Sequence, residues 1–242
     1  MEKTCALKQT KRNFDRSMTL SSEAKSDIQW WIDSISEAYN PVNRGDPDIN
    51  MSTDASLSGW GACLDGMTTG GRWNPDEATH DINYLEMLAV LFALQSFSDK
   101  VLAKHIKLMV DNTIAVATIN QMGTCHSNLN NKLVQQIWEW CILHGVWLTV
   151  SHIPGKCNTE ADRESRLSRK ETESCLDRSI YSAVIQKLDV IPDIDLFASR
   201  LNHQLKPYIA YRPYPGALAV NAFHIRSEEH TSELQSRGLI SY

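Results

Sequence analysis

The chain has 242 residues, which suits one large domain or one medium domain with appendages. Hydrophobic residues make up 42% of it and charged residues 22%, as is typical of a globular protein. Its net charge of −5 gives no general attraction to nucleic acid. No apolar run approaches the ~20 residues that span a bilayer, and the N-terminus lacks the apolar region of a signal peptide, so a membrane protein is not expected. Six cysteines without a C-x-x-C pair argue against a zinc site or a disulfide framework and for reduced thiols inside a cell, in the cytoplasm, the nucleus or both.

Residues 1–47 are predicted to be a basic lead-in followed by one connecting helix. The first 25 residues carry six Lys/Arg against three acids and show no sustained periodicity. Ser22 is a candidate N-cap for a helix with an apolar stripe. The stripe consists of Ile28, Trp31, Ile32 and Ile35. A linker over residues 41–47 then precedes the main domain, which is predicted over residues 48–170.

The main domain is predicted to contain strands, a helix, a strand, two helices, a strand and a last helix. A first strand runs from Ile49 to about Asp54, and GWGACLDG and GGRWN follow as its antiparallel partners. INYLEMLAVLFALQSF has helical periodicity, and HIKLMVD is a continuous apolar run of the kind found in a strand buried on both faces. NTIAVATINQMG and SNLNNKLVQQIWEWCILHG are predicted helices, VWLTVSHI is a strand, and Asn158 or Thr159 caps a helix through about Arg169. The order predicts an α/β fold whose mixed central sheet has three antiparallel strands, then parallel ones, with helices on its faces.

The composition changes after residue 170. Residues 171–225 contain an acid pair, Asp193 and Asp195, among several prolines and tyrosines, and are interpreted as an extension that need not be complete. Residues 226–242 include RSEEHTSELQS, whose codons can be written as a common sequencing adapter. We therefore interpret this tail as an artefact and exclude it from the fold.

Four acidic residues fall at the ends of predicted elements: Asp54, Glu86, Asp111 and Asp162. Each has an ordinary explanation by itself, namely a turn residue, a first-turn glutamate, an N-cap and another first-turn acid. As a set they indicate a site, because strand ends and helix starts meet at one edge of an open α/β sheet. Packed carboxylates repel unless divalent cations neutralise them, and two ions about 4 Å apart can clamp the oxygens of a phosphodiester.

Four motifs carry a family resemblance: TDAS…GWGA, INYLEMLA, VDNTIAVATINQMG and HIPGKCNTEADRESR. Over about residues 48–170 they resemble the ribonuclease H domain of reverse transcriptases, most closely that of DIRS-type retrotransposons. The resemblance implies a ribonuclease H-like fold that hydrolyses the RNA strand of an RNA–DNA hybrid and leaves a 3′-hydroxyl. The implied catalytic and metal-binding set is Asp54, Glu86, Asp111 and Asp162, holding two Mg²⁺ ions, with Mn²⁺ as an alternative.

The resemblance also implies partners and substrate contacts. The partners are the hybrid itself and the polymerase domain of the same polyprotein, which residues 1–47 would join; neither a membrane nor a stable small-molecule ligand is expected. Ser56, Asn112 and Ser127 are candidates for contacts to the substrate strands, and the 2′-hydroxyl would distinguish RNA from DNA. The small residues after Asp54 are interpreted as room for an approaching nucleic-acid backbone.

Some features depart from the family pattern. Lys156 follows Gly155 where many cellular ribonucleases H have a histidine, and His152 is expected to be structural rather than catalytic. A basic handle between the middle helices is missing. A catalytically inactive retroelement fragment that only binds nucleic acid or connects domains is therefore the alternative function. A proofreading exonuclease is disfavoured because Ser56 stands where such enzymes carry a glutamate.

The segment DIDLFASRLNHQLKPY resembles a stretch that follows the ribonuclease H domain in DIRS-type polyproteins. It is also weakly similar to the opening of phage-type adenine-N6 methyltransferase-like domains. No N-P-P-Y type motif accompanies it, so no methyltransferase activity is predicted. We expect the segment to be a structural extension that packs on the main domain.

Overall fold

A computed structural model describes residues 19–37, 44–167 and 174–224 of the chain. The chain divides into two compact units, Met1–Asp46 and Pro47–Tyr242. In the first unit, helix α2 (Ser22–Ser34) begins one residue earlier than expected, because Ser21 rather than Ser22 is its N-cap and accepts a hydrogen bond from the backbone N–H of Ala24. The start of the basic lead-in and the adapter-like tail lie outside the described residues.

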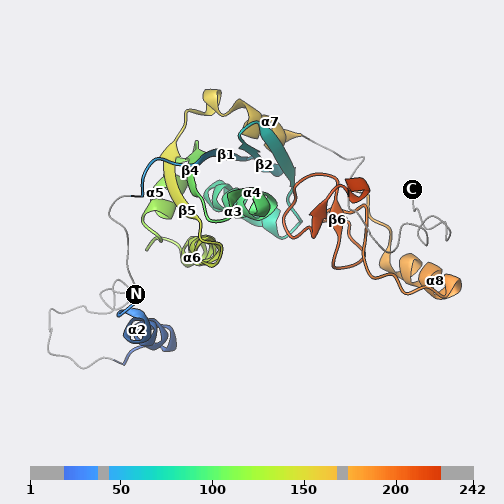
Figure 1. The fold of residues 1–242 in the computed structure, drawn as a ribbon, viewed down its shortest axis with the longest axis horizontal. Helices are drawn as coiled ribbons and strands as arrows, with labels where there is room; N and C mark the ends of the chain where they lie inside the picture. Colours follow the sequence, from blue (N-terminus) through green and yellow to red (C-terminus); the bar gives the residue numbers. More distant parts are fainter. Residues whose placement is uncertain (1–18, 38–43, 168–173, 225–242) are drawn as a thin grey trace. The chain divides into compact units, whose positions relative to one another are not determined.

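The second unit is built around a five-stranded sheet with strand order β3-β2-β1-β4-β5 (Figure 1). The strands are β1 (Ile49–Ala55), β2 (Gly59–Leu64), β3 (Met67–Arg72), β4 (His105–Val110) and β5 (Trp147–His152). Strands β1, β2 and β3 pair antiparallel, whereas β4 is parallel to both β1 and β5. This arrangement confirms the predicted α/β class and its mixed sheet.

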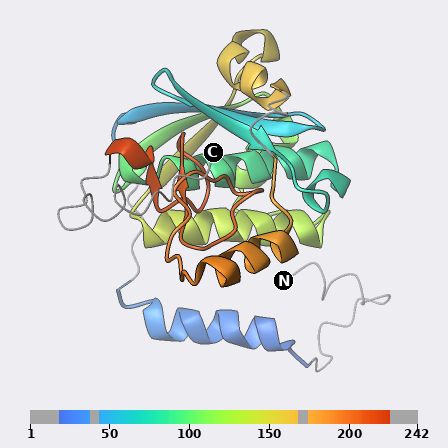
Figure 2. The same ribbon diagram turned by 90° about the vertical axis from the view of Figure 1, so that its right-hand side faces the viewer.

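Helices lie on both faces of the sheet. They are α3 (Ile82–Ser96), α4 (Ser98–Val101), α5 (Thr113–Asn120), α6 (Asn128–Leu143) and α7 (Thr159–Arg166), with single 3₁₀ turns at Glu77–Thr79 and Gly155–Cys157. Figure 2 shows α7 on one side of the sheet and α3 on the other, with α6 stacked beyond α3. Because α3 lies between the sheet and α6, all its residues from Leu85 to Leu94 are buried. None of the described helices is long and apolar enough to cross a membrane.

The apolar run of β4 predicted a strand that is buried on both faces, but only one of its faces is buried. Ile106, Leu108 and Val110 are buried on the face that α3 covers, whereas Lys107 between them is exposed. The helix on the opposite face, α7, packs over β1, β2 and β3 and leaves β4 open to solvent there. The prediction for this strand was therefore wrong, and β4 is half-buried.

The glycines that follow Asp54 make room for helix α7 and not for nucleic acid. A Cβ atom on Gly61 would lie 2.1 Å from the carbonyl oxygen of Ala161, and one on Gly59 would lie 3.1 Å from that of Ser165. Gly70 on the neighbouring strand faces the same helix, and a Cβ atom added to it would lie 3.1 Å from the Cβ of Glu164. For Gly59 and Gly61 the interpretation as clearance for a substrate backbone is therefore wrong, since backbone atoms of the helix lie there; for the other small residues it stays a prediction.

The C-terminal extension packs against β3 and α3 within the second unit. Its described elements are α8 (Arg178–Leu188), β6 (Ile209–Ala210), β7 (Ala219–Val220) and a 3₁₀ turn at Ala222–His224. Arg200 forms an ion pair with Glu77 at 2.6 Å, and its guanidinium lies 4.5 Å from the ring centre of Phe92. Thr69 of β3 donates a hydrogen bond to the carbonyl oxygen of Pro213. The extension therefore belongs to the same hydrophobic core as the sheet.

Replacing Tyr214 should show how much the C-terminal extension stabilises the fold. Its hydroxyl would collide with any Cβ on Gly71, and its ring lies 5.8 Å from that of Trp60, centre to centre. Tyr214→Ala should lower the free energy of unfolding by about 3 kcal/mol, the usual cost of emptying an aromatic site. Tyr211→Ala is the control, because Tyr211 is 81% exposed and Tyr214 only 7%. Equal urea midpoints for the two variants would show that the extension does not share the core.

Candidate active site

Three of the four predicted acids meet at one edge of the sheet. Carboxylate oxygens of Asp54, Glu86 and Asp111 lie within 4.8 Å of one another. The parallel pairing of β1 with β4 places Thr53 opposite Val110, so the next residues, Asp54 and Asp111, lie side by side. Glu86 reaches the same point from the buried helix α3. The convergence follows from the strand order, since β1 and β4 are adjacent and α3 packs against β1.

Burial and mutual repulsion raise the pKa of two of these carboxyl groups. Asp54 and Glu86 are only 3% and 4% exposed. Burial raises the pKa of Glu86 to about 9, and the charges of Asp54 and Asp111 add to the effect. Burial likewise raises the pKa of Asp54 to about 6, although a hydrogen bond from Ser165 opposes the shift. The cluster therefore resists ionisation unless a cation compensates its charge.

The donor set suits a hard divalent cation. All three candidate ligands are carboxylates. Hard cations such as Mg²⁺, Mn²⁺ and Ca²⁺ prefer oxygen ligands of this kind, whereas softer metals prefer thiolate or imidazole. Glu86 Oε2 is buried without a hydrogen-bond partner among the described residues, which is costly unless something cationic meets it. These residues could therefore bind a metal ion, and the unpartnered oxygen is the structural reason.

Asp111 is free for such a role because its neighbour caps the following helix. The side-chain oxygen of Asn112 accepts hydrogen bonds from the backbone N–H groups of Ile114 and Ala115. The alternative interpretation of Asp111 as an N-cap is therefore wrong. The late loop also approaches this carboxylate, since a Cβ on Gly155 would lie 3.0 Å from Asp111 Oδ2.

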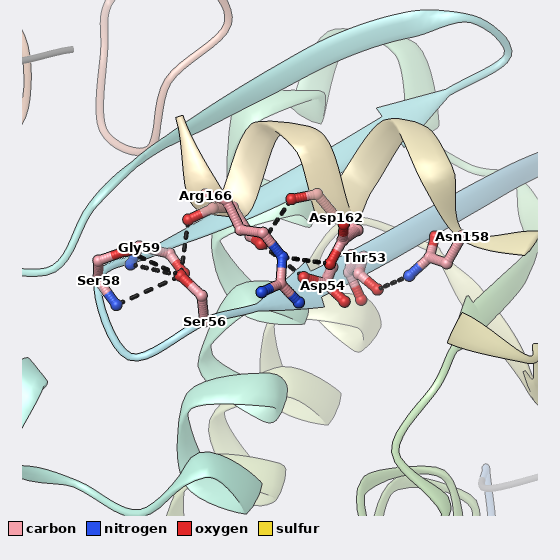
Figure 3. A network of polar contacts seen from close by, with 9 residues as sticks. Thr53, Asp54, Ser56, Ser58, Gly59, Asn158, Asp162 and Arg166 are labelled. Carbon is pink, nitrogen blue, oxygen red and sulfur yellow. Dashed lines mark hydrogen bonds and ion pairs between the residues drawn. The ribbon is translucent and has the colours of Figure 1, made fainter. Parts of the chain in front are cut away.

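Helix α7 is tied to strand β1 beside the cluster. Ser165 Oγ donates a hydrogen bond of 2.6 Å to Asp54 Oδ2, and Ser56 Oγ donates one of 2.7 Å to the carbonyl oxygen of Ser165. Asn158 donates to the carbonyl oxygen of Thr53 at 2.8 Å (Figure 3). These bonds orient one oxygen of Asp54 and leave the other for a cation. Sequence reasoning missed Ser165; its only signal was a small polar residue one turn after Asp162.

Asp162 lies next to the cluster but is not one of the three converging acids. Its Oδ1 accepts a hydrogen bond of 2.6 Å from Nε of Arg166, one turn later on α7 (Figure 3). The Asp162 side chain is 38% exposed, whereas Asp54 is buried. Its charge still contributes to the raised pKa of Asp54, so the two carboxyl groups are close enough to interact. The geometry therefore gives a triad of two buried acids and one half-buried acid, and a fourth acid held by an arginine.

The three candidate substrate contacts are all hydrogen-bonded within the fold. Ser56 joins β1 to α7, Asn112 caps α5 and also donates to Asn83 Oδ1 at 2.9 Å, and Ser127 caps α6 through the N–H of Asn130. His152 is the last residue of β5 and is exposed. Direct contact of Ser56, Asn112 or Ser127 with a substrate stays a prediction.

Comparisons with known proteins concern the fold. No protein-family model matches the chain, and no curated protein matches it. The chain is similar to ribonuclease H1 from the archaeon Halobacterium salinarum, with 18% identity, a TM-score of 0.36, and 48% of this chain and 92% of that one covered. It is also similar to LC11-RNase H1 in complex with an RNA/DNA hybrid, at 17% identity and a TM-score of 0.37, with 48% and 93% covered.

A third solved structure is the foamy viral protease-reverse transcriptase in complex with an RNA/DNA hybrid. Its identity to this chain is 11% and its TM-score 0.34, and the alignment covers 67% of this chain and 25% of that one. The mixed five-stranded sheet, with its order β3-β2-β1-β4-β5 and its flanking helices, has the α/β layout that the sequence predicted. That this layout is a ribonuclease H-like fold stays a prediction from the sequence motifs.

Proposed function

We propose that the second unit is an RNase H-type endonuclease that hydrolyses the RNA strand of an RNA–DNA hybrid. The observation that carries the proposal is the triad of buried Asp54 and Glu86 with half-buried Asp111, whose oxygens lie within 4.8 Å of one another. Two buried carboxylates packed against a third, half-buried one would destabilise the fold without a cation, so their convergence calls for a function. Divalent-ion chemistry on a phosphodiester is the function that this donor set fits best.

The chain's own residues would hold the ions and the substrate. Asp54, Glu86 and Asp111 would be ligands, with Asp162 as a fourth, for two Mg²⁺ ions or for Mn²⁺. When bound, such ions activate a water molecule and stabilise the charge on the leaving oxygen. Ser165 keeps Asp54 oriented through its 2.6 Å hydrogen bond. Ser56, Asn112 and Ser127 lie on loops and helix starts where backbone and hydroxyl groups would contact the strands.

The sequence motifs support a retroelement context for this activity. We propose that the domain over residues 48–170 belongs to a DIRS-type retrotransposon reverse transcriptase, that residues 1–47 connect it to the polymerase domain, and that residues 171–225 are an extension of it. The polymerase domain would then supply affinity for the hybrid that a chain of net charge −5 lacks.

The test is cleavage of a hybrid whose RNA strand is labelled. The full chain with Mg²⁺ should cut that strand and leave 3′-hydroxyl ends, and it should cut neither the same RNA alone nor the corresponding DNA duplex. Chelation of the metal should stop the reaction. If the hybrid is bound but stays intact at every concentration of Mg²⁺ or Mn²⁺, the alternative of an inactive binding or connecting fragment holds instead.

A further inference from the structure

Arg166 is the cation that lies nearest to the acids in the described part of the chain. Its Nε donates a hydrogen bond of 2.6 Å to Asp162 Oδ1, and its side chain is 68% exposed. Figure 3 shows the guanidinium beside both Asp162 and Asp54. Burial raises the pKa of Asp54, and the charge of Arg166 opposes that rise. The hydrogen bond to Asp162 raises the pKa of Arg166, and the charges of Asp54 and Asp111 add to the effect. The arginine therefore interacts with Asp54 and Asp111 and not only with its bonded partner.

The ion pair is short but exposed, which makes it easy to exchange. An exposed pair of this kind contributes little net stability, because solvent screens it and both side chains lose freedom. A divalent ion carries twice the charge and can bind Asp162 together with buried carboxylates that Arg166 does not contact directly. Competition between the two cations for one carboxylate should consequently favour the divalent ion at a sufficient concentration.

We propose that Arg166 is a positioning residue that occupies Asp162 in the metal-free protein and gives up this carboxylate when a divalent ion binds. The inference rests on the proposed function, because it assumes that the triad binds metal. Arg166 holds Asp162 beside Asp54 and offsets part of the repulsion that this fourth carboxylate adds. The release also frees the guanidinium, whose planar set of N–H donors matches the oxygens of a phosphodiester. Metal-ion binding at Asp162 and the bond from Arg166 therefore exclude each other.

The experiment measures metal binding without any RNA. The full chain is titrated with Mg²⁺, and separately with Mn²⁺, at constant ionic strength, and the unfolding temperature is followed. Arg166→Gln should lower the half-saturating concentration of the ion about two- to fivefold, which corresponds to the loss of a competing exposed ion pair. Arg166→Lys keeps the positive charge and should give a smaller change.

Arg163→Gln is the matched control. Arg163 lies on the same helix and is similarly exposed, but its ion pair is to Glu164, at 3.7 Å. The Arg163→Gln substitution changes the net charge by the same amount as Arg166→Gln. It should leave the half-saturating concentration of the ion within about 1.5-fold of that of the unsubstituted chain, as expected of a more distant screened charge. In an Asp162→Asn background, Arg166→Gln should have no further effect, because the competition has already been removed.

The possible outcomes separate the two proposals. If neither ion stabilises the unsubstituted chain, the metal site and the proposed function fail together. If the ions stabilise it but Arg166→Gln binds them no more tightly, or more weakly, then Arg166 does not compete with the metal and this inference alone is overturned. A shift of the same size in Arg163→Gln would also overturn it, since the effect would then be one of net charge.

Discussion

Replacing Glu86 by glutamine is expected to stabilise the metal-free protein at neutral pH and to remove the hydrolysis of hybrids. Glutamine has nearly the shape of protonated glutamate, but it cannot ionise. In the cluster, burial and two neighbouring carboxylates raise the pKa of Glu86 from 4.5 to about 9. The unfolded chain, whose Glu86 has its ordinary pKa, ionises in that range without this penalty. We therefore expect a gain of about 2–4 kcal/mol near pH 7.5 in the absence of divalent ions.

The pH dependence follows with a definite sign. Because the pKa of Glu86 is higher in the folded than in the unfolded protein, its stabilising contribution is complete below pH 4.5 and is lost as the pH rises through about 9. Asp54 acts in the same direction over a lower range, from 3.8 to about 6. Urea unfolding with chelator at several pH values between 5 and 9 should therefore show a decline for the unsubstituted chain that is shallower in Glu86→Gln.

Activity should change in the opposite direction. The loss of one ligand from a metal site costs several kcal/mol of transition-state stabilisation, so cleavage should fall at least about 100-fold. Glu139→Gln is the control, because Glu139 is an exposed residue of helix α6 bonded only to Gln135 at 2.9 Å among the contacts described, and the substitution is chemically the same. If Glu86→Gln and Glu139→Gln have equal stability and equal activity, Glu86 is not part of a strained carboxylate cluster.

Replacing Gly61 by alanine is expected to displace helix α7 and with it the polar contacts of the site. The added Cβ would lie 2.1 Å from the carbonyl oxygen of Ala161 and 2.6 Å from the backbone nitrogen of Ser165. Both are main-chain atoms, so the whole helix must move. Overpacking of this kind costs about 1–3 kcal/mol or more, and a displacement of 1 Å at a reacting centre can reduce the rate about 100-fold.

Gly66→Ala distinguishes this effect from the ordinary cost of replacing a glycine. Gly66 has a φ of +84° in the turn between β2 and β3, and nothing lies within 4 Å of its added Cβ. Its substitution should cost about 1 kcal/mol through backbone strain but leave the cleavage rate unchanged. Urea unfolding and the rate of hybrid cleavage, measured for both variants, check the prediction. An unchanged cleavage rate in Gly61→Ala would show that the docking of α7 does not position the site.

The sheet and the three converging acids could be predicted from the sequence because local patterns determine them. Alternating and apolar runs locate β1 and β4, and their parallel pairing brings Asp54 and Asp111 together without further information. Glu86 was identifiable because its helix contains no other charged residue. These features depend on periodicity and on element order, which one sequence contains.

Contacts between distant segments could not be predicted in the same way. Gly61 is explained by a helix about 100 residues later, and nothing in its local sequence indicates this packing. The bond of Arg166 to Asp162 was equally hidden, because an i,i+4 pair on a helix usually lies on a solvated face. The hydrogen bond from the Ser165 hydroxyl to Asp54 could be recognised only once the position of β1 relative to α7 was known.

The most direct test of the account is the cleavage of a labelled RNA–DNA hybrid by the full chain and by Asp111→Asn, side by side, with Mg²⁺. Asparagine keeps the size of the side chain and removes the charge that Asp111 contributes to the triad. The unsubstituted chain should cleave the RNA strand, and the variant should cleave it at least about 100-fold more slowly. Cleavage at the same rate by both proteins would contradict this expectation.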